Sequence, residues 1–141
     1  MSAARAGAAA LAACVALAVG GCGQDEGQAD AARQATRTYF AALAAGDAAR
    51  ACSLLARDVR RQFVARVAAI TSAPDCPAAL GTLLKGRGGS LVKRVARAAR
   101  VGDAKVDGDT ATVKLSSNAQ QVDVRLRRED GAWRVDQPPT G

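Results

Sequence analysis

Cysteine is the reactive side chain that this sequence places most selectively. Four cysteines occur among 141 residues, Cys14, Cys22, Cys52 and Cys76, and there is no histidine. Without histidine the chain has no serine–histidine–acid triad and lacks the side chain that most often moves protons at neutral pH. A structural zinc site is also disfavoured, because only Cys52 and Cys76 are expected to remain with free sulfurs in the exported domain, as argued below. Two sulfurs fall short of the four ligands that such a site needs.

The first two cysteines belong to an N-terminal segment that has the layout of an export signal. Arg5 precedes an apolar run from Ala8 to Val19, and two glycines separate that run from Cys22. A positive start, an apolar run and small residues before a cleavage point are typical of a secretory signal. The run is too short to span a bilayer as a stable helix. We therefore expect residues 1–21 to be removed on export.

The end of this segment, Val19-Gly20-Gly21-Cys22, resembles the lipobox of bacterial lipoproteins. The resemblance implies that the Cys22 sulfur carries a diacylglyceryl group and that the chain is anchored to the outer face of the cytoplasmic membrane, in the cell envelope. An ordinary signal followed by a fortuitous cysteine is the alternative. The next residues are polar and have no apolar periodicity, so we expect residues 22–30 to be the lipidated cysteine and a tether.

The two remaining cysteines form a natural pair. Cys14 is discarded with the signal and Cys22 is used by the lipid, which leaves Cys52 and Cys76 in the exported domain. An even remainder in an oxidising compartment favours a disulfide. Closing a loop of this size stabilises a fold by about 3 kcal/mol through the lost entropy of the unfolded chain. Two buried free thiols are the alternative.

The charge balance restricts the partners. Twenty Lys and Arg against thirteen Asp and Glu give a formal net charge of +7, and removal of Arg5 lowers it by one. A basic exported domain favours anionic lipid or an acidic wall polymer, whereas export and only two Phe, one Tyr and one Trp argue against nucleic acid. A solvated basic face is the simpler reading. The residues of a basic interaction surface would be Arg94, Arg97, Arg100, Arg125 and Arg127.

The first half of the domain is predicted to be helical. Residues 31–45 are rich in strong helix formers, with Thr36, Phe40 and Leu43 on one stripe, and Gly46 ends the segment. Aspartates are expected to cap the helices that follow. These are Asp47 for residues 48–56, Asp58 for residues 59–70, and Asp75, followed by Pro77, for a helix that ends near residue 84.

The second half is predicted to form antiparallel strands. Residues 85–90 contain three glycines and two cations but lack the full phosphate-loop pattern, so we expect a flexible loop. The following segment is ambiguous at first and then strand-like. Apolar residues alternate with polar ones within residues 110–116, 121–127 and 132–136. Asp107-Gly108 and Asp130-Gly131 are dipeptides that favour two-residue hairpin turns.

Helices followed by strands predict an α+β fold in which the helices cover one face of a curled sheet. Residues 35–63 and the strands within residues 106–136 resemble the opening and closing parts of nuclear transport factor 2-like domains, in particular the functionally undefined branch similar to lumazine-binding proteins. The resemblance implies a cone with an apolar pocket, over residues 31–137, before a tail of residues 138–141. The family includes enzymes similar to ketosteroid isomerases and polyketide cyclases as well as binding modules, so the fold alone does not choose.

The acidic residues favour a binding module over an enzyme. Most aspartates fall at expected tether, cap or turn positions, and no pair of acids stands in an apolar setting that would raise a pKa. We therefore expect no catalytic residue, no cofactor and no metal. The favoured hypothesis is a membrane-anchored domain that binds a small apolar or amphipathic molecule, or a partner protein. The candidate pocket lining is Tyr39, Phe40, Phe63 and Trp133, for which plain core packing is the alternative.

Overall fold

The computed structural model describes residues 22–118 and 120–138, which form five helices followed by four strands. The helices are α1 (Cys22–Ala45), α2 (Ala48–Ser53), α3 (Arg57–Thr71), α4 (Cys76–Lys85) and α5 (Gly89–Ala98). The strands are β1 (Arg100–Asp107), β2 (Thr110–Ser117), β3 (Gln120–Glu129) and β4 (Ala132–Gln137). The expected signal, residues 1–21, and residues 139–141 of the expected tail lie outside the described residues.

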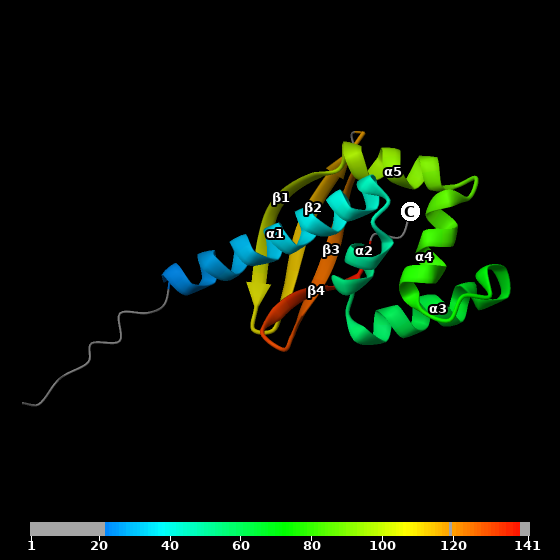
Figure 1. Ribbon diagram of the computed structural model, residues 1–141. Coiled ribbons are helices and arrows are strands. Elements are labelled where there is room, and N and C mark those ends of the chain that lie inside the picture. The colour runs from blue at the N-terminus through cyan, green and yellow to red at the C-terminus, as the bar shows by residue number, and fades with distance from the viewer. Residues whose placement is uncertain (1–21, 119, 139–141) are drawn as a thin grey trace, which may run out of the picture.

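The four strands form one antiparallel sheet in the order β1-β2-β3-β4. Figure 1 shows α1 crossing one face of this sheet, while α2 to α5 gather at one end of it. Residues 54–56, between α2 and α3, extend the sheet beyond β4: the Val135 N–H donates to Leu54 O at 2.7 Å, and the Ala56 N–H donates to Val135 O at 2.9 Å. The predicted α+β class is confirmed.

Two tight turns set the register of the sheet. Asp130 and Gly131 join β3 to β4 with φ of 51° and 78°, as the primed hairpin turns require. Between β1 and β2 the loop residues are Gly108 and Asp109, because Asp107 already pairs with Thr110. The turn between β1 and β2 is therefore one residue later than the predicted dipeptide Asp107-Gly108, and its positive-φ position is Gly108.

The core lies between α1 and the sheet. Val113, Val124 and Val135 from three strands are fully buried. Thr36 of α1 is also fully buried. Its polar hydroxyl tolerates burial because it donates a hydrogen bond to the carbonyl of Ala32 at 2.9 Å. The predicted stripe of α1 therefore packs on the sheet.

The expected tether is instead helical. α1 begins at Cys22, and residues 23–30 are its first turns. Residues 23–27 are exposed, and Figure 1 shows this part of α1 projecting beyond the sheet. The helix thus begins before residue 31, its predicted start, and a contact distant in sequence supports its early turns: Gln28 accepts hydrogen bonds from Arg128 and Trp133 of the sheet.

The expected loop at residues 85–90 is also shorter than predicted. α4 continues to Lys85 and α5 begins at Gly89, so only residues 86–88 connect them. Gly89 permits this close turn, because a Cβ there would lie 2.0 Å from the backbone oxygen of Leu84. The ambiguous segment that follows is helical as far as Ala98 and becomes a strand at Arg100.

Among the described residues, no single helix is both long and apolar enough to cross a membrane. α3 and α4 pass that test of length and composition only when they are taken as one pair, bent by 51°.

Candidate functional site

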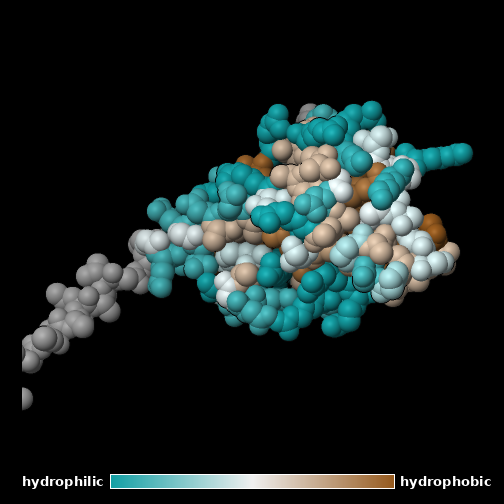
Figure 2. All heavy atoms as spheres, in the orientation of Figure 1, coloured by the Kyte–Doolittle hydropathy of each residue, from teal (hydrophilic) through white to brown (hydrophobic). Residues whose placement is uncertain are grey.

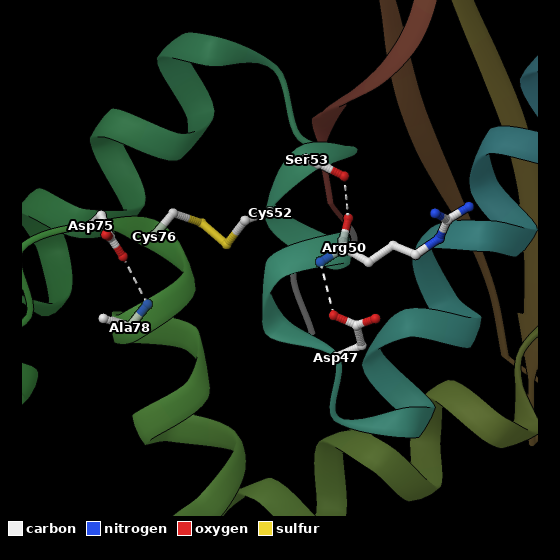
Figure 3. Close-up of a disulfide and its surroundings, with 7 residues drawn as sticks. All are labelled: Asp47, Arg50, Cys52, Ser53, Asp75, Cys76 and Ala78. Carbon is white, nitrogen blue, oxygen red and sulfur yellow. Dashed lines mark hydrogen bonds between the residues drawn. A yellow bond between two sulfur atoms is a disulfide. The ribbon is translucent and has the colours of Figure 1, made fainter.

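A disulfide holds the helical end of the domain together. Cys52 of α2 is bonded to Cys76 of α4, with their Cα atoms 6.0 Å apart, so the predicted pairing is confirmed (Figure 3). Two predicted caps place the cysteines. The Asp47 carboxylate accepts the Arg50 N–H at 3.0 Å, and the Asp75 carboxylate accepts the Ala78 N–H at 2.9 Å.

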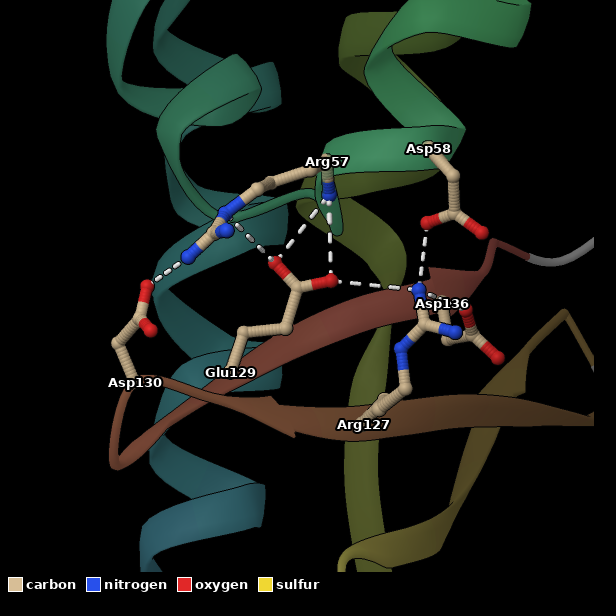
Figure 4. A network of polar contacts seen from close by, with 6 residues as sticks. All are labelled: Arg57, Asp58, Arg127, Glu129, Asp130 and Asp136. Atoms are coloured by element: carbon tan, nitrogen blue, oxygen red, sulfur yellow. Dashed lines mark hydrogen bonds and ion pairs between the residues drawn. The ribbon is translucent and has the colours of Figure 1, made fainter.

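A charged network joins α3 to β3 and β4 (Figure 4). At its centre, Nη2 of Arg127 lies 2.5 Å from Asp58, 3.2 Å from Glu129 and 3.3 Å from Asp136. Desolvation raises the pKa of Asp58, but backbone hydrogen bonds and the Arg127 charge outweigh it and hold that pKa below its usual value. The carboxylates neutralise Arg127, so it does not add to a basic interaction surface.

Glu129 also caps α3 across the fold. Its carboxylate oxygens accept the backbone N–H of Arg57, the first residue of α3, at 3.3 Å. The Arg57 side chain forms ion pairs with Glu129 and Asp130. The prediction that Asp58 caps this helix was wrong, because the helix begins one residue before Asp58 and the cap comes from β3.

Two adjoining cavities meet at Tyr39. One, of about 510 Å³, lies between α1, α3 and α4, and Phe63 and Leu80 are among its lining residues. The other, of about 290 Å³, lies between α1 and α5 and includes Phe40. Tyr39 and Pro138 line both. We call these two spaces together the Tyr39 cavities.

The four predicted lining residues divide into two groups. Tyr39, Phe40 and Phe63 line the Tyr39 cavities, and the rings of Tyr39 and Phe40 contact each other edge to face with centroids 5.3 Å apart. Trp133 does not line either cavity. Its indole is 5% exposed and packs in the core below α1. Trp133 therefore follows the alternative of core packing.

The polar groups of the larger cavity come from α3 and the end of β4. Gln62, Arg66 and Asp136 contribute to its lining, and Asp136 is already paired with Arg127. Burial raises the pKa of Tyr39 to about 12, so its hydroxyl stays protonated at neutral pH and is a hydrogen-bond donor. The site therefore combines an apolar wall with a small number of polar groups, as small-molecule sites do.

The contribution of α5 to this site was not predicted from the sequence. Leu91, Val92 and Val95 line the smaller cavity. Their spacing at i, i+1 and i+4 is the signal of one helical face. It was obscured by alternating arginines and alanines.

Another cavity lies elsewhere, beside the disulfide. It measures about 700 Å³, and Cys52, Cys76, Arg60 and Arg61 are among its lining residues. It is more open to solvent than the larger of the Tyr39 cavities. Because an apolar ligand gains most where it is enclosed, the Tyr39 cavities are the better candidate, although each of them is smaller than the cavity beside the disulfide.

Within residues 22–118 and 120–138, no three His, Cys, Asp or Glu side chains are grouped so that they could hold a metal ion. Comparison of the chain with protein-family models, with curated proteins and with solved structures gives no match.

Proposed function

We propose that this chain is an exported lipoprotein whose domain binds a small apolar or amphipathic ligand in the Tyr39 cavities without catalysing a reaction. The observation that carries the proposal is the meeting of two apolar cavities, of about 510 and 290 Å³, at Tyr39 and Pro138. Ligand sites in proteins commonly occupy a few hundred Å³ and are lined mainly by apolar side chains.

The chemistry of the lining favours binding over catalysis. Asp136, the carboxylate among the residues of the larger cavity, is paired with Arg127 at 3.3 Å and has no apolar setting of its own. The raised pKa of Tyr39 keeps its hydroxyl from acting as a base at neutral pH. The sequence has no histidine to take that role. An enzyme similar to a cyclase or isomerase is therefore the less favoured alternative.

The proposed localisation rests on the N-terminal sequence. An aliphatic residue, two glycines and Cys22 follow an apolar run, as in a lipobox, and α1 starts at Cys22. A lipid on Cys22 would therefore join a helix that continues directly into the domain. The finer assignment of the fold, a nuclear transport factor 2-like cone, is part of this proposal. It is supported by a long helix that crosses one face of an antiparallel meander, with the other helices gathered at one end of the sheet.

Intact mass spectrometry tests both parts of the proposal. The chain is extracted from the membranes of its host and its mass is recorded under native conditions and again after denaturation. We expect a lipid-sized increment on Cys22 that survives denaturation, and a second increment that is lost. Absence of the first overturns the anchor, and absence of the second overturns the bound ligand.

Matched variants assign the second increment to the Tyr39 cavities. Phe63→Ala removes a ring that lines the larger cavity, whereas Val67→Ala, one turn further along the same half-buried stripe of α3, removes a side chain that lines neither of them. We expect the first variant to lose the noncovalent increment and the second to keep it. Equal retention by both variants would place the ligand elsewhere.

A further inference from the structure

Helix α5 exposes an unusual amount of apolar surface. Leu91, Val92 and Val95 are 54%, 41% and 44% exposed. Only two other large hydrophobic residues in the described part of the chain are comparably exposed, Ile70 and Val122, and each stands on a different element. Figure 2 shows hydrophobic colour in the region of α5, next to hydrophilic side chains. A contiguous exposed apolar patch of this kind marks an interaction surface.

The same part of the chain is strongly basic. Residues 85–100 contain six cations and no acid. The cations are Lys85, Arg87, Lys93, Arg94, Arg97 and Arg100. Within the described part of the chain, none of the six forms a salt bridge. Their charge is therefore free to act on an anionic partner.

The helical period separates two kinds of cation on α5. At 100° per residue, Arg94 lies beside Leu91 at the edge of the exposed apolar flank, whereas Lys93 and Arg97 lie on the other side, toward α1. Arg97 confirms this direction, because its guanidinium donates to the backbone oxygen of Ala44 at the end of α1, at 3.3 Å. The exposed flank therefore presents apolar side chains with Arg94 at its border.

We propose that α5 lies on the surface of an anionic phospholipid bilayer, with Leu91, Val92 and Val95 entering the headgroup region and Arg94 binding lipid phosphates. Helices that lie in a membrane interface combine an apolar flank with cationic side chains, as the flank of α5 does with Arg94. Charge complementarity selects the bilayer, since a segment with no acid and six cations, none of them in a salt bridge within the described part of the chain, repels a basic partner and attracts anionic headgroups.

The contact of α5 with a bilayer does not depend on a ligand in the Tyr39 cavities, but it changes the route by which a ligand would enter them. Leu91, Val92 and Val95 also line the smaller cavity. With α5 on the bilayer, that cavity opens at the lipid surface, and an amphipathic molecule reaches it without crossing water.

Vesicle flotation tests the contact separately from the lipid anchor. The chain from residue 22 onward includes every described helix and strand, and Cys22→Ser removes the attachment point. This chain is mixed with phosphatidylcholine vesicles that do or do not contain about one third phosphatidylglycerol. We expect it to float with the anionic vesicles only, and to be released by high salt. Equal binding to both vesicles, or to neither, overturns the proposal.

Paired variants assign the binding to α5. Arg94→Gln should weaken binding about fivefold, the usual effect of one cation near an anionic surface. The control, Lys105→Gln at an exposed position of β1, should keep wild-type binding. Leu91→Ser with Val95→Ser should abolish flotation, while Ile70→Ser on α3 should not. Thermal unfolding of each variant checks that the domain remains folded. If the α5 variants float as the controls do, α5 is not the contact.

Discussion

The side-chain oxygen of Gln28 accepts a hydrogen bond from the indole N–H of Trp133 across 3.2 Å, which ties the start of α1 to the far edge of the sheet. The same oxygen accepts from Nη2 of Arg128 at 2.7 Å, and the Arg128 guanidinium lies 5.5 Å from the centre of the Trp133 ring. These three residues fix the direction of α1 as it leaves the domain. A lipid on Cys22 would therefore hold the domain through a continuous helix.

Replacing Gln28 tests this connection. Gln28→Ala removes the acceptor for a buried indole N–H, so we expect the free energy of unfolding to fall by about 1–2 kcal/mol. Urea denaturation measures the loss, and the fluorescence of Trp133, the only tryptophan, should shift to the red as water reaches the indole. Gln34→Ala, at an exposed position of the same helix, is the control. Equal stability of the two variants would mean that the Gln28 contact does not hold α1.

The disulfide should be a main source of stability for the helical end. Replacing both Cys52 and Cys76 by alanine opens a loop that spans 24 positions, and we expect a loss of about 3 kcal/mol. Denaturation of the unmodified domain with and without reductant should give a similar difference. An unchanged midpoint after complete reduction would contradict this prediction.

Local signals in the sequence were sufficient for much of this fold. Asp47 and Asp75 were predicted as caps because the cap residue and the amide that it accepts are three positions apart. The cap of α3 was not predictable in that way, because Glu129 lies 72 positions from Arg57. The strands followed from their period of two, whereas the position of α5 depends on packing that its arginine-rich sequence does not reveal.

The candidate site was predictable to a similar degree. Tyr39, Phe40 and Phe63 were identified because aromatic residues on helical stripes face the interior. Trp133 was predicted to face the interior from the alternation of its strand, but that strand places it against α1 rather than at the cavities. Only the assembled fold distinguishes a core residue from a lining residue, since both are apolar and face inward.

The cap that Glu129 provides for α3 is open to a direct comparison. Glu129→Ala leaves the first amide of α3 without its acceptor, and we expect a loss of about 1 kcal/mol, the usual value for a cap. Asp130→Asn is the matched control, because it removes the charge that pairs with Arg57, the side chain is 78% exposed, and asparagine tolerates the positive φ of this turn position. Chemical denaturation of the two variants gives the difference. A larger loss for Asp130→Asn would show that the ion pair, and not the cap, holds α3.

Asp58 should make the domain more stable above its titration range than below it. Its pKa in the folded protein is below the usual value of 3.8, so its contribution is present above that value and is lost as the pH falls through the lower folded pKa. We expect Asp58→Asn to flatten the acid side of the stability profile. An acid side that is the same in Asp58→Asn as in the unmodified domain would contradict the role of the Arg127 pair.

Tyr39 gives the opposite dependence on pH. Burial raises its pKa from 10.0 to about 12 in the folded domain, because the charged phenolate is costly away from water. Its neutral form therefore contributes stability that is fully present below pH 10 and is lost as the pH rises toward 12. Since the chain has one tyrosine, the absorbance of the phenolate reports this group alone. We expect half-titration near 12 in the folded domain and near 10 in urea, and Tyr39→Phe should remove part of the alkaline destabilisation. Titration near 10 in the folded domain would mean that water reaches the hydroxyl freely. Tyr39 would then not be buried where the two Tyr39 cavities meet.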